Sequence, residues 1–160
     1  MACDPLLNAR LLAEAKAQAV IRTSGGNWIL GADTLVVIDR EVLGKPANEN
    51  EAFSMLRKLS GKEHSVITGF CLVAPDSKKA HSEAVVTRVT FKALTKTEIL
   101  GYVATGEPLG KAGSYAIQGI GAFLVKGITG SYTNVVGLPL CALVNALVAT
   151  GALKTFPISP

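Results

Sequence analysis

Apolar residues recur along the chain in blocks whose spacing predicts helices alternating with strands. Residues 5–22 are alanine-rich and show helical spacing, which predicts a helix with an apolar stripe of Leu7, Leu11, Leu12 and Ala15. Residues 28–38 form an apolar run that predicts a buried strand. Residues 65–74 and 84–91 are two further β-rich runs around the turn-like segment PDSKK, and we therefore expect a hairpin.

Alternation within the second run of this hairpin indicates which face is wetter. Residues 85, 87, 89 and 91 alternate with the generally more polar set Val86, Arg88, Thr90 and Lys92. Because side chains along a strand point to opposite faces in turn, the latter set predicts the face that meets water.

Capping residues mark the ends of the remaining helices. Asn48 precedes a helical segment that ends near Gly61. Thr95 and Glu98 form a T-x-x-E capping box that opens another helix. Pro139 takes a favoured first helical position, and the closing helix runs to about residue 150. The glycine-punctuated stretch between these two helices predicts short strands and tight loops that line a site.

Composition supports one globular unit of the α/β class. The chain has 160 residues, of which 49% are hydrophobic and 18% charged, and it contains 16 glycines. We therefore predict a single α/β domain over residues 1–160, with a mixed sheet flanked by helices. The longest apolar stretch, LPLCALVNALVAT, is too short to span a bilayer, so no membrane association is expected.

Cysteine usage and the first residues of the chain favour a cytoplasmic location. Cys3, Cys71 and Cys141 are odd in number and form no C-x-x-C pair, which indicates a reducing compartment and no zinc site. The N-terminal MACDPLLNAR lacks the apolar core of a signal peptide.

The net charge of +4 is not concentrated in any polybasic run. A small polyanion such as a nucleotide suits this balance. An RNA-binding module is a weaker interpretation, because aromatic residues are only 6% of the chain and no stacking platform is apparent.

Several familiar catalytic signatures are absent from the chain. GEPLGKA has three residues between its glycines and an alanine after the lysine, so it fails as a P-loop. GIGAFL lacks the third glycine of a dinucleotide fingerprint. His64 and His81 form no H-E-x-x-H pair. We expect His81 to be solvated beside its lysine-rich turn and His64 to be structural.

Four polar residues stand in apolar or glycine-rich surroundings and are candidates for a site. Asp33 lies inside the apolar run, where a carboxylate is costly to bury unless it is paired or faces a cleft. It is either bonded to backbone amides at a bend or part of a site. Lys45, in a Gly-Lys-Pro turn, and Lys16, on the first helix, are locally compatible with plain surface positions. Gln118, in YAIQGIG, reads as a buried amide that must find partners.

Taken in order, GADT, LGKP, LSGKEHSVITG and AGSYAIQGIGAFLVKGITGSYTNVVGLPL resemble the Maf family of nucleoside triphosphate pyrophosphatases over nearly the whole chain. The resemblance implies an elongated α/β fold with a cleft between two lobes. It also implies homodimerisation, and cleavage of a nucleoside triphosphate to the monophosphate and pyrophosphate with a divalent cation, Mg²⁺ or Mn²⁺.

The resemblance also assigns roles to individual residues. Asp33 matches the family's catalytic acidic residue, whose carboxylate accepts a proton from the attacking water. Thr34 and Gln118 match positions linked to base specificity, and Lys16 and Lys45 match lysines that line the triphosphate cleft. The IQG form of the last motif resembles the branch that acts on dTTP and UTP. Gln118 offers both a donor and an acceptor, which suits the imide edge of thymine and uracil.

The chain departs from the family pattern at its start. The family begins with a strand leading into an S-x-S-P-R-R motif that holds phosphates, and this motif is absent from the sequence. We therefore expect a domain truncated at its N-terminus by roughly 30 to 40 residues, with an exposed sheet edge or a gap in its core. The alternative function is that of a catalytically impaired homologue that binds nucleotide or a partner in cell-division control.

Overall fold

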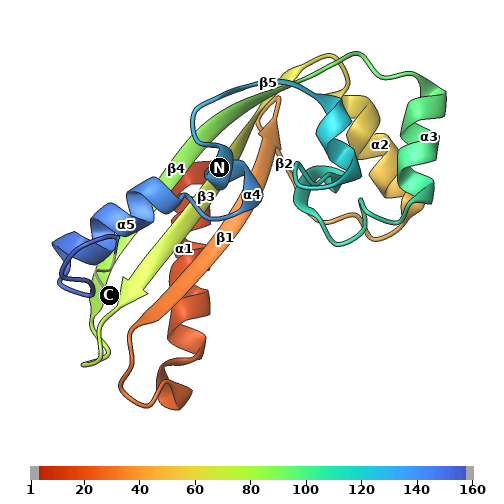
Figure 1. Cartoon of the computed structure of the whole chain (residues 1–160). Coiled ribbons are helices and arrows are strands. Elements are labelled where there is room, and N and C mark those ends of the chain that lie inside the picture. Colours follow the sequence, from red (N-terminus) through yellow and green to blue (C-terminus); the bar gives the residue numbers. More distant parts are fainter. Residues whose placement is uncertain (1–3, 158–160) are drawn as a thin grey trace.

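The computed structural model describes residues 4–157, in which five strands form one long, curved sheet (Figure 1). The strand order is β2-β1-β3-β4-β5, with bounds β1 Ile29–Ile38, β2 Glu41–Leu43, β3 Glu63–Val73, β4 Lys79–Phe91 and β5 Val125–Thr129. Every neighbouring pair among these strands is antiparallel. The predicted α/β class and the β3–β4 hairpin are confirmed, but the predicted mixed sheet is wrong.

Short connections explain two of the antiparallel pairs, β1–β2 and β3–β4. A two-residue turn joins β1 to β2, and residues 74–78 join β3 to β4. Connections of this length can join only antiparallel neighbours, since a parallel crossover needs a dozen or more residues. Strand β2 has only three residues, which is too short to show as a period in the sequence.

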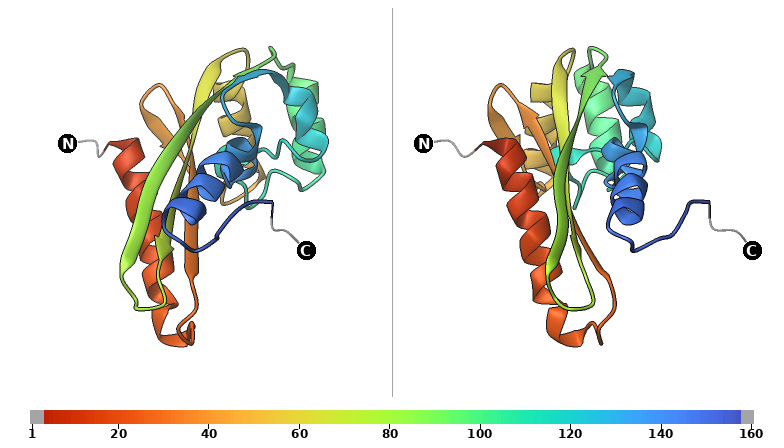
Figure 2. Two further views of the ribbon diagram at one scale, coloured as in Figure 1. Left: turned by 60° about the vertical axis from the view of Figure 1, so that its left-hand side comes forward. Right: turned by 90° about the vertical axis from the view of Figure 1, so that its left-hand side faces the viewer.

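Helices cover both faces of the sheet and one of its ends. The helices are α1 Pro5–Ala19, α2 Glu49–Leu59, α3 Lys96–Ala104, α4 Tyr132–Val136 and α5 Leu140–Ala149. In the right-hand view of Figure 2, α1 lies on one side of the strands and α5 on the other. Figure 1 shows α2 and α3 together beyond one end of the long strands. The sheet thus carries two groups of helices, one along its length and one at its end.

Helix α1 packs on the sheet through alanines, not through its leucines. Ala9, Ala13 and Ala17 are fully buried. They face Gly31 and Gly69, where an added Cβ would lie 2.3 Å from the Ala13 carbonyl oxygen and 2.2 Å from that of Ala9. Only glycine permits so close an approach, so small residues face the strands. The predicted stripe is therefore wrong, and its members are exposed: Leu7, Leu11, Leu12 and Ala15.

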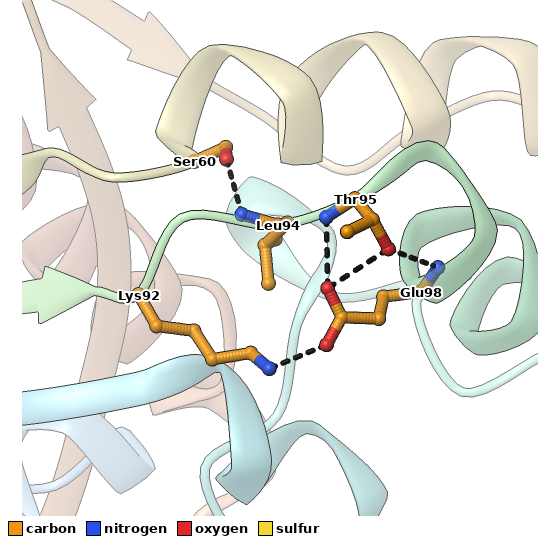
Figure 3. A network of polar contacts seen from close by, with 5 residues as sticks. All are labelled: Ser60, Lys92, Leu94, Thr95 and Glu98. Atoms are coloured by element: carbon orange, nitrogen blue, oxygen red, sulfur yellow. Dashed lines mark hydrogen bonds and ion pairs between the residues drawn. The ribbon is translucent and has the colours of Figure 1, made fainter.

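The predicted caps of α2 and α3 are confirmed, and a polar network ties the two helices together (Figure 3). Thr95 and Glu98 form the reciprocal capping box, and Lys92 pairs with Glu98. The Lys92 ammonium, together with the Thr95 N–H and hydroxyl, lowers the pKa of Glu98 to about 2. The Leu94 N–H donates to Ser60 Oγ at the end of α2, at 2.7 Å. These bonds fix the start of α3 against the end of α2.

The glycine-punctuated stretch contains short helical turns as well as the predicted short strand. These are η2 Ala112–Ser114, η3 Ile120–Leu124, β5 and α4. Helix α5 begins at Leu140 with Pro139 as its N-cap. The largest apolar cluster joins the strands to α2 and α3, and a smaller one lies beneath α5.

No helix within residues 4–157 has the length and hydropathy needed to cross a membrane. Cys71 is buried and Cys141 is exposed, and neither forms a disulfide with another cysteine of residues 4–157. The third cysteine, Cys3, lies outside the described residues.

Candidate active site

One cleft of about 450 Å³ brings together the five site residues predicted from the sequence. Its lining includes Lys16 from α1, Asp33 and Thr34 from β1, Lys45 from the turn after β2, and Gln118 from the segment between η2 and η3. The residues come from four separate parts of the chain. The cleft therefore lies where the helix-covered sheet meets the group of elements at its end.

A free strand edge explains how neighbouring residues of β1 reach the same cleft. Strand β2 pairs only with residues 36–38 of β1, whereas β3 pairs along residues 29–37. Among the described residues, the edge of β1 before Val36 has no other strand beside it. Asp33 and Thr34 point to opposite faces of the sheet, and both border the open edge.

The carboxylate of Asp33 forms an ion pair with Lys16. The Lys16 ammonium also donates to the Ala32 carbonyl oxygen at 3.1 Å. The Asp33 side chain is only 19% exposed, whereas that of Lys16 is 57% exposed. Asp33 is thus not buried alone, and no backbone amide within residues 4–157 donates to its side chain. It is tolerated because it faces a polar cleft and a cation.

Positive side chains outnumber negative ones around this carboxylate. Lys111 lines the cleft together with Lys16 and Lys45, and Asp33 is the only carboxylate among the described lining residues. Sequence reasoning missed Lys111, which stands in the segment GEPLGKA that had been excluded as a P-loop. A cleft with three ammonium groups and one carboxylate favours a ligand with several negative charges.

A buried hydrogen-bond network lies beneath Thr34. Its hydroxyl oxygen is 2.9 Å from that of Thr68, and the Thr68 hydroxyl donates to the Asn134 carbonyl oxygen at 3.1 Å. The Asn134 amide donates to Thr87 Oγ1 at 2.9 Å and to the Val66 carbonyl oxygen at 3.1 Å. Thr68, Thr87 and Asn134 have no exposed surface.

The network fixes the direction of the hydroxyl protons. Thr68 has one hydroxyl proton, and it is directed to a carbonyl oxygen that can only accept. Thr34 must therefore donate its own proton to Thr68. The remaining lone pairs of Thr34 are left for a donor in the cleft. The sequence signal for this network was Thr68 between apolar residues in VITGF, whereas Asn134 lies in the polar segment SYTN and does not stand out there.

Gln118 differs from its predicted environment. Its side chain is exposed at the wall of the cleft, whereas the sequence context predicted a buried amide. Gly119 and Gly121 bring the backbone of this segment close to Glu107 and Tyr102. The apolar residues that flank Gln118 in the sequence therefore do not cover its side chain.

The two histidines lie outside the lining of the cleft. His64 is buried, and its Nε2 is 2.9 Å from the hydroxyl oxygen of Tyr115, which lines the cleft. Burial lowers the pKa of His64 to about 4, so the ring is neutral at pH 7, as its predicted structural role requires. His81 is half-buried, stacked on Phe70 and bonded to Glu83 at 3.0 Å. The prediction that His81 is solvated is therefore confirmed only in part, since 33% of its side chain is exposed.

The donor set of the cleft fits a divalent cation shared with a substrate rather than one held by protein alone. Within residues 4–157 no group of three or more His, Cys, Asp or Glu side chains is arranged to hold a metal ion. Mg²⁺ commonly binds through one or two carboxylates together with substrate phosphates. Asp33 offers one such carboxylate in the lining of the cleft.

Comparison with known proteins adds independent information. The profile of the Maf family, described as Maf-like protein, matches residues 4–150. The dTTP/UTP pyrophosphatase of Citrifermentans bemidjiense is 51% identical over 150 residues, which are 94% of this chain and 78% of that protein. The dTTP/UTP pyrophosphatase of Geobacter sulfurreducens is 52% identical over 145 residues, or 91% of this chain and 76% of the relative. A protein of the same name from Ruminiclostridium cellulolyticum is 51% identical over 143 residues, covering 89% of this chain and 74% of its own length.

Proposed function

The chain belongs to the Maf family, and from that premise we propose that it hydrolyses dTTP and UTP to the monophosphate and pyrophosphate. The observation that carries the proposal is the single cleft that gathers Lys16, Asp33, Thr34, Lys45 and Gln118. Relatives about half identical to the chain carry the name dTTP/UTP pyrophosphatase, which supports the choice of substrate.

The lysines of the cleft suit the triphosphate. A nucleoside triphosphate carries roughly four negative charges near neutral pH, and further charge develops on the leaving pyrophosphate. Lys45 and Lys111 approach the cleft from separate segments, so they can contact different phosphates. Lys16 can exchange its contact with Asp33 for a phosphate oxygen, because the lysine side of the pair is 57% exposed and open to the cleft.

Asp33 then takes the role of general base. When Lys16 moves to a phosphate, the Asp33 carboxylate is free to accept a proton from a water molecule. That water attacks the α-phosphorus of the nucleotide, the bond from this phosphorus to the oxygen shared with the β-phosphorus breaks, and pyrophosphate leaves. Asp33 is the carboxylate of the cleft that would hold a divalent cation, and the cation would supply positive charge to offset that of the leaving pyrophosphate.

Thr34 and Gln118 are proposed to read the base. Thr34 presents an acceptor to the cleft because its proton is committed to Thr68. Thymine and uracil carry an N3–H donor, whereas cytosine has an acceptor at the same ring position. Gln118 can both donate and accept at the other atoms of the imide edge. An acceptor-only Thr34 therefore favours dTTP and UTP over CTP.

The direct test is to identify the products. Purified protein with Mg²⁺ or Mn²⁺ is incubated with UTP, dTTP, CTP and GTP, and phosphorus NMR distinguishes pyrophosphate from orthophosphate. We expect pyrophosphate and the monophosphate from UTP and dTTP, with slower reaction of CTP and GTP. Release of orthophosphate with a nucleoside diphosphate, or no reaction of any of the four, would contradict the proposal. Homodimerisation is proposed on the family resemblance alone, and a cytoplasmic location is proposed on the cysteine usage, which indicates a reducing compartment.

A further inference from the structure

The carboxylate of Glu107 collects three hydrogen bonds next to the candidate site. Its Oε1 accepts from the Tyr102 hydroxyl at 2.8 Å and from the Gly121 N–H at 2.9 Å. Its Oε2 accepts from the Ile120 N–H at 2.8 Å. The Tyr102 hydroxyl oxygen in turn accepts from the Ala116 N–H at 3.2 Å. Glu107 and Tyr102 form a pair that we term the loop clamp.

The loop clamp holds the backbone on both sides of Gln118. Ala116 lies two residues before Gln118 and Ile120 two residues after it. Gln118 itself is exposed and contributes no hydrogen bond of its own to the fold within the described residues. The position of its side chain in the cleft wall therefore depends on how its neighbours are held.

The glycines of the IQGIG segment are explained by the loop clamp. A Cβ added to Gly119 would lie 2.6 Å from Glu107 Oε2, and one added to Gly121 would lie 2.4 Å from the Tyr102 hydroxyl oxygen. Larger residues at these two positions would push the loop away from the clamp. The glycines thus serve close contact with Glu107 and Tyr102.

Both members of the clamp have the protonation state that the contacts require. Burial alone would raise the pKa of Glu107, but the Gly121 N–H, the Tyr102 hydroxyl and the Ile120 N–H together hold that pKa below its usual value. Burial raises the pKa of Tyr102, which keeps its hydroxyl proton available. At neutral pH an anionic acceptor therefore faces three neutral donors.

We propose that Glu107 and Tyr102 are positioning residues that set base discrimination by holding Gln118 in the cleft wall. The inference rests on the proposed function, since discrimination is read with UTP and CTP. Neither residue lines the cleft. Lys16 and Lys45, which are proposed to contact the phosphates, belong to other elements. Lys111, the third such lysine, follows Glu107 by four residues but lies outside the segment from Ala116 to Gly121 that the clamp holds, so the clamp acts on the base end of the substrate.

The test uses Glu107→Gln and Tyr102→Phe in the full chain. Glutamine keeps the length of Glu107 but presents an amide N–H₂ where a carboxylate oxygen accepted a bond, so one donor loses its partner. Phenylalanine removes the hydroxyl that joins Glu107 to the Ala116 N–H. Glu98→Gln is the matched control. Glu98, like Glu107, accepts a backbone N–H with its carboxylate, but it does not line the cleft.

We expect the ratio of kcat/KM for UTP to that for CTP to fall about tenfold or more in both clamp variants, with KM for UTP raised. Inhibition by inorganic pyrophosphate, which reports on the phosphate end alone, should stay within about twofold of wild type. The ratio should be unchanged in Glu98→Gln. An equal loss for UTP and CTP in the clamp variants, or no loss for either, would overturn the inference.

Hydrogen exchange separates this inference from the proposed function. The amides of Ile120 and Gly121 should exchange faster in Glu107→Gln than in wild type, while amides of β3 stay protected. If wild type proves inactive toward nucleotides but the loop amides lose protection, the proposed function fails and the clamp stands as a loop-holding device. If exchange at these two amides is unchanged, the clamp does not hold the loop and the inference is overturned.

Discussion

Replacing Gly31 by alanine is expected to destabilise the protein and to disturb the site at the same time. A Cβ at Gly31 would lie 2.3 Å from the Ala13 carbonyl oxygen and 2.7 Å from the Ala17 backbone nitrogen. Ordinary van der Waals contact begins at about 3.4 Å, so α1 must lift from the sheet by about 1 Å. Both obstructing atoms belong to the helix backbone and cannot turn aside as a flexible side chain would.

The magnitude follows from overpacking of a tight helix–sheet contact. Forcing an extra methyl group into such a contact costs roughly 1–3 kcal/mol. In a domain of this size each kcal/mol lowers Tm by about 2–4 °C. Because the obstructed turn of α1 also carries Lys16, its contact with Asp33 moves as well. We therefore expect nucleotide hydrolysis to fall along with the free energy of unfolding.

Gly127→Ala is the matched control for this experiment. Gly127 lies in β5, and apart from its two neighbours in the chain no atom of the described residues would lie within 4 Å of an alanine methyl there. Urea and thermal unfolding of the two variants should show a loss for Gly31→Ala and little change for Gly127→Ala. A Gly31→Ala protein as stable as wild type would show that α1 does not approach β1 as closely as described, and the reasoning would be refuted.

Three further changes test other parts of the account. Stability should decrease as the pH falls from about 6.5 to about 4, because the unfolded chain protonates His64 at its ordinary pKa of 6.5 while the folded one resists until about 4. That difference is worth roughly 3 kcal/mol, and urea unfolding of His64→Gln should show a flatter pH dependence. Thr68→Val should cost about 1–3 kcal/mol in unfolding free energy because it leaves buried polar groups without partners, and Thr68→Ser should restore most of it. Lys45→Ala should raise KM for UTP by roughly tenfold, whereas Lys126→Ala, outside the cleft, should not; equal steady-state constants for the two variants would remove Lys45 from phosphate binding.

Local sequence signals predicted the ends of elements better than their packing. The caps at Asn48 and Thr95 depend on residues a few positions apart, so the sequence displays them directly. The packing face of α1 could not be predicted from its own residues. It is decided by Gly31 and Gly69, which lie on strands and admit only alanines between helix and sheet. A stripe of leucines is the usual signal for the buried side, and here it marks the exposed one.

The same contrast applies to the candidate site: some residues were recognisable from their neighbours in the sequence, and others only from contacts made in the folded chain. Asp33 stood out locally because an acid inside an apolar run needs a reason. Lys16 and Lys45 had only weak local signals and were assigned a role through the family resemblance. Thr68 and Asn134 were missed, because the bond between them joins residues far apart in the sequence. Glu107 was missed because its contacts are visible only once the loop around Gln118 is folded back upon it.

The most direct test of the central claim compares Asp33→Asn with Asp39→Asn in a pyrophosphate-release assay on UTP with Mg²⁺. Asp39 is a matched control because it is also paired with a lysine, Lys62, but lies on an exposed turn away from the cleft. Circular dichroism and Tm would establish that both variants fold. We predict that kcat falls at least about 100-fold in Asp33→Asn and stays near the wild-type value in Asp39→Asn. A folded Asp33→Asn protein that releases pyrophosphate within about threefold of the wild-type rate would contradict the assignment of Asp33 as the base.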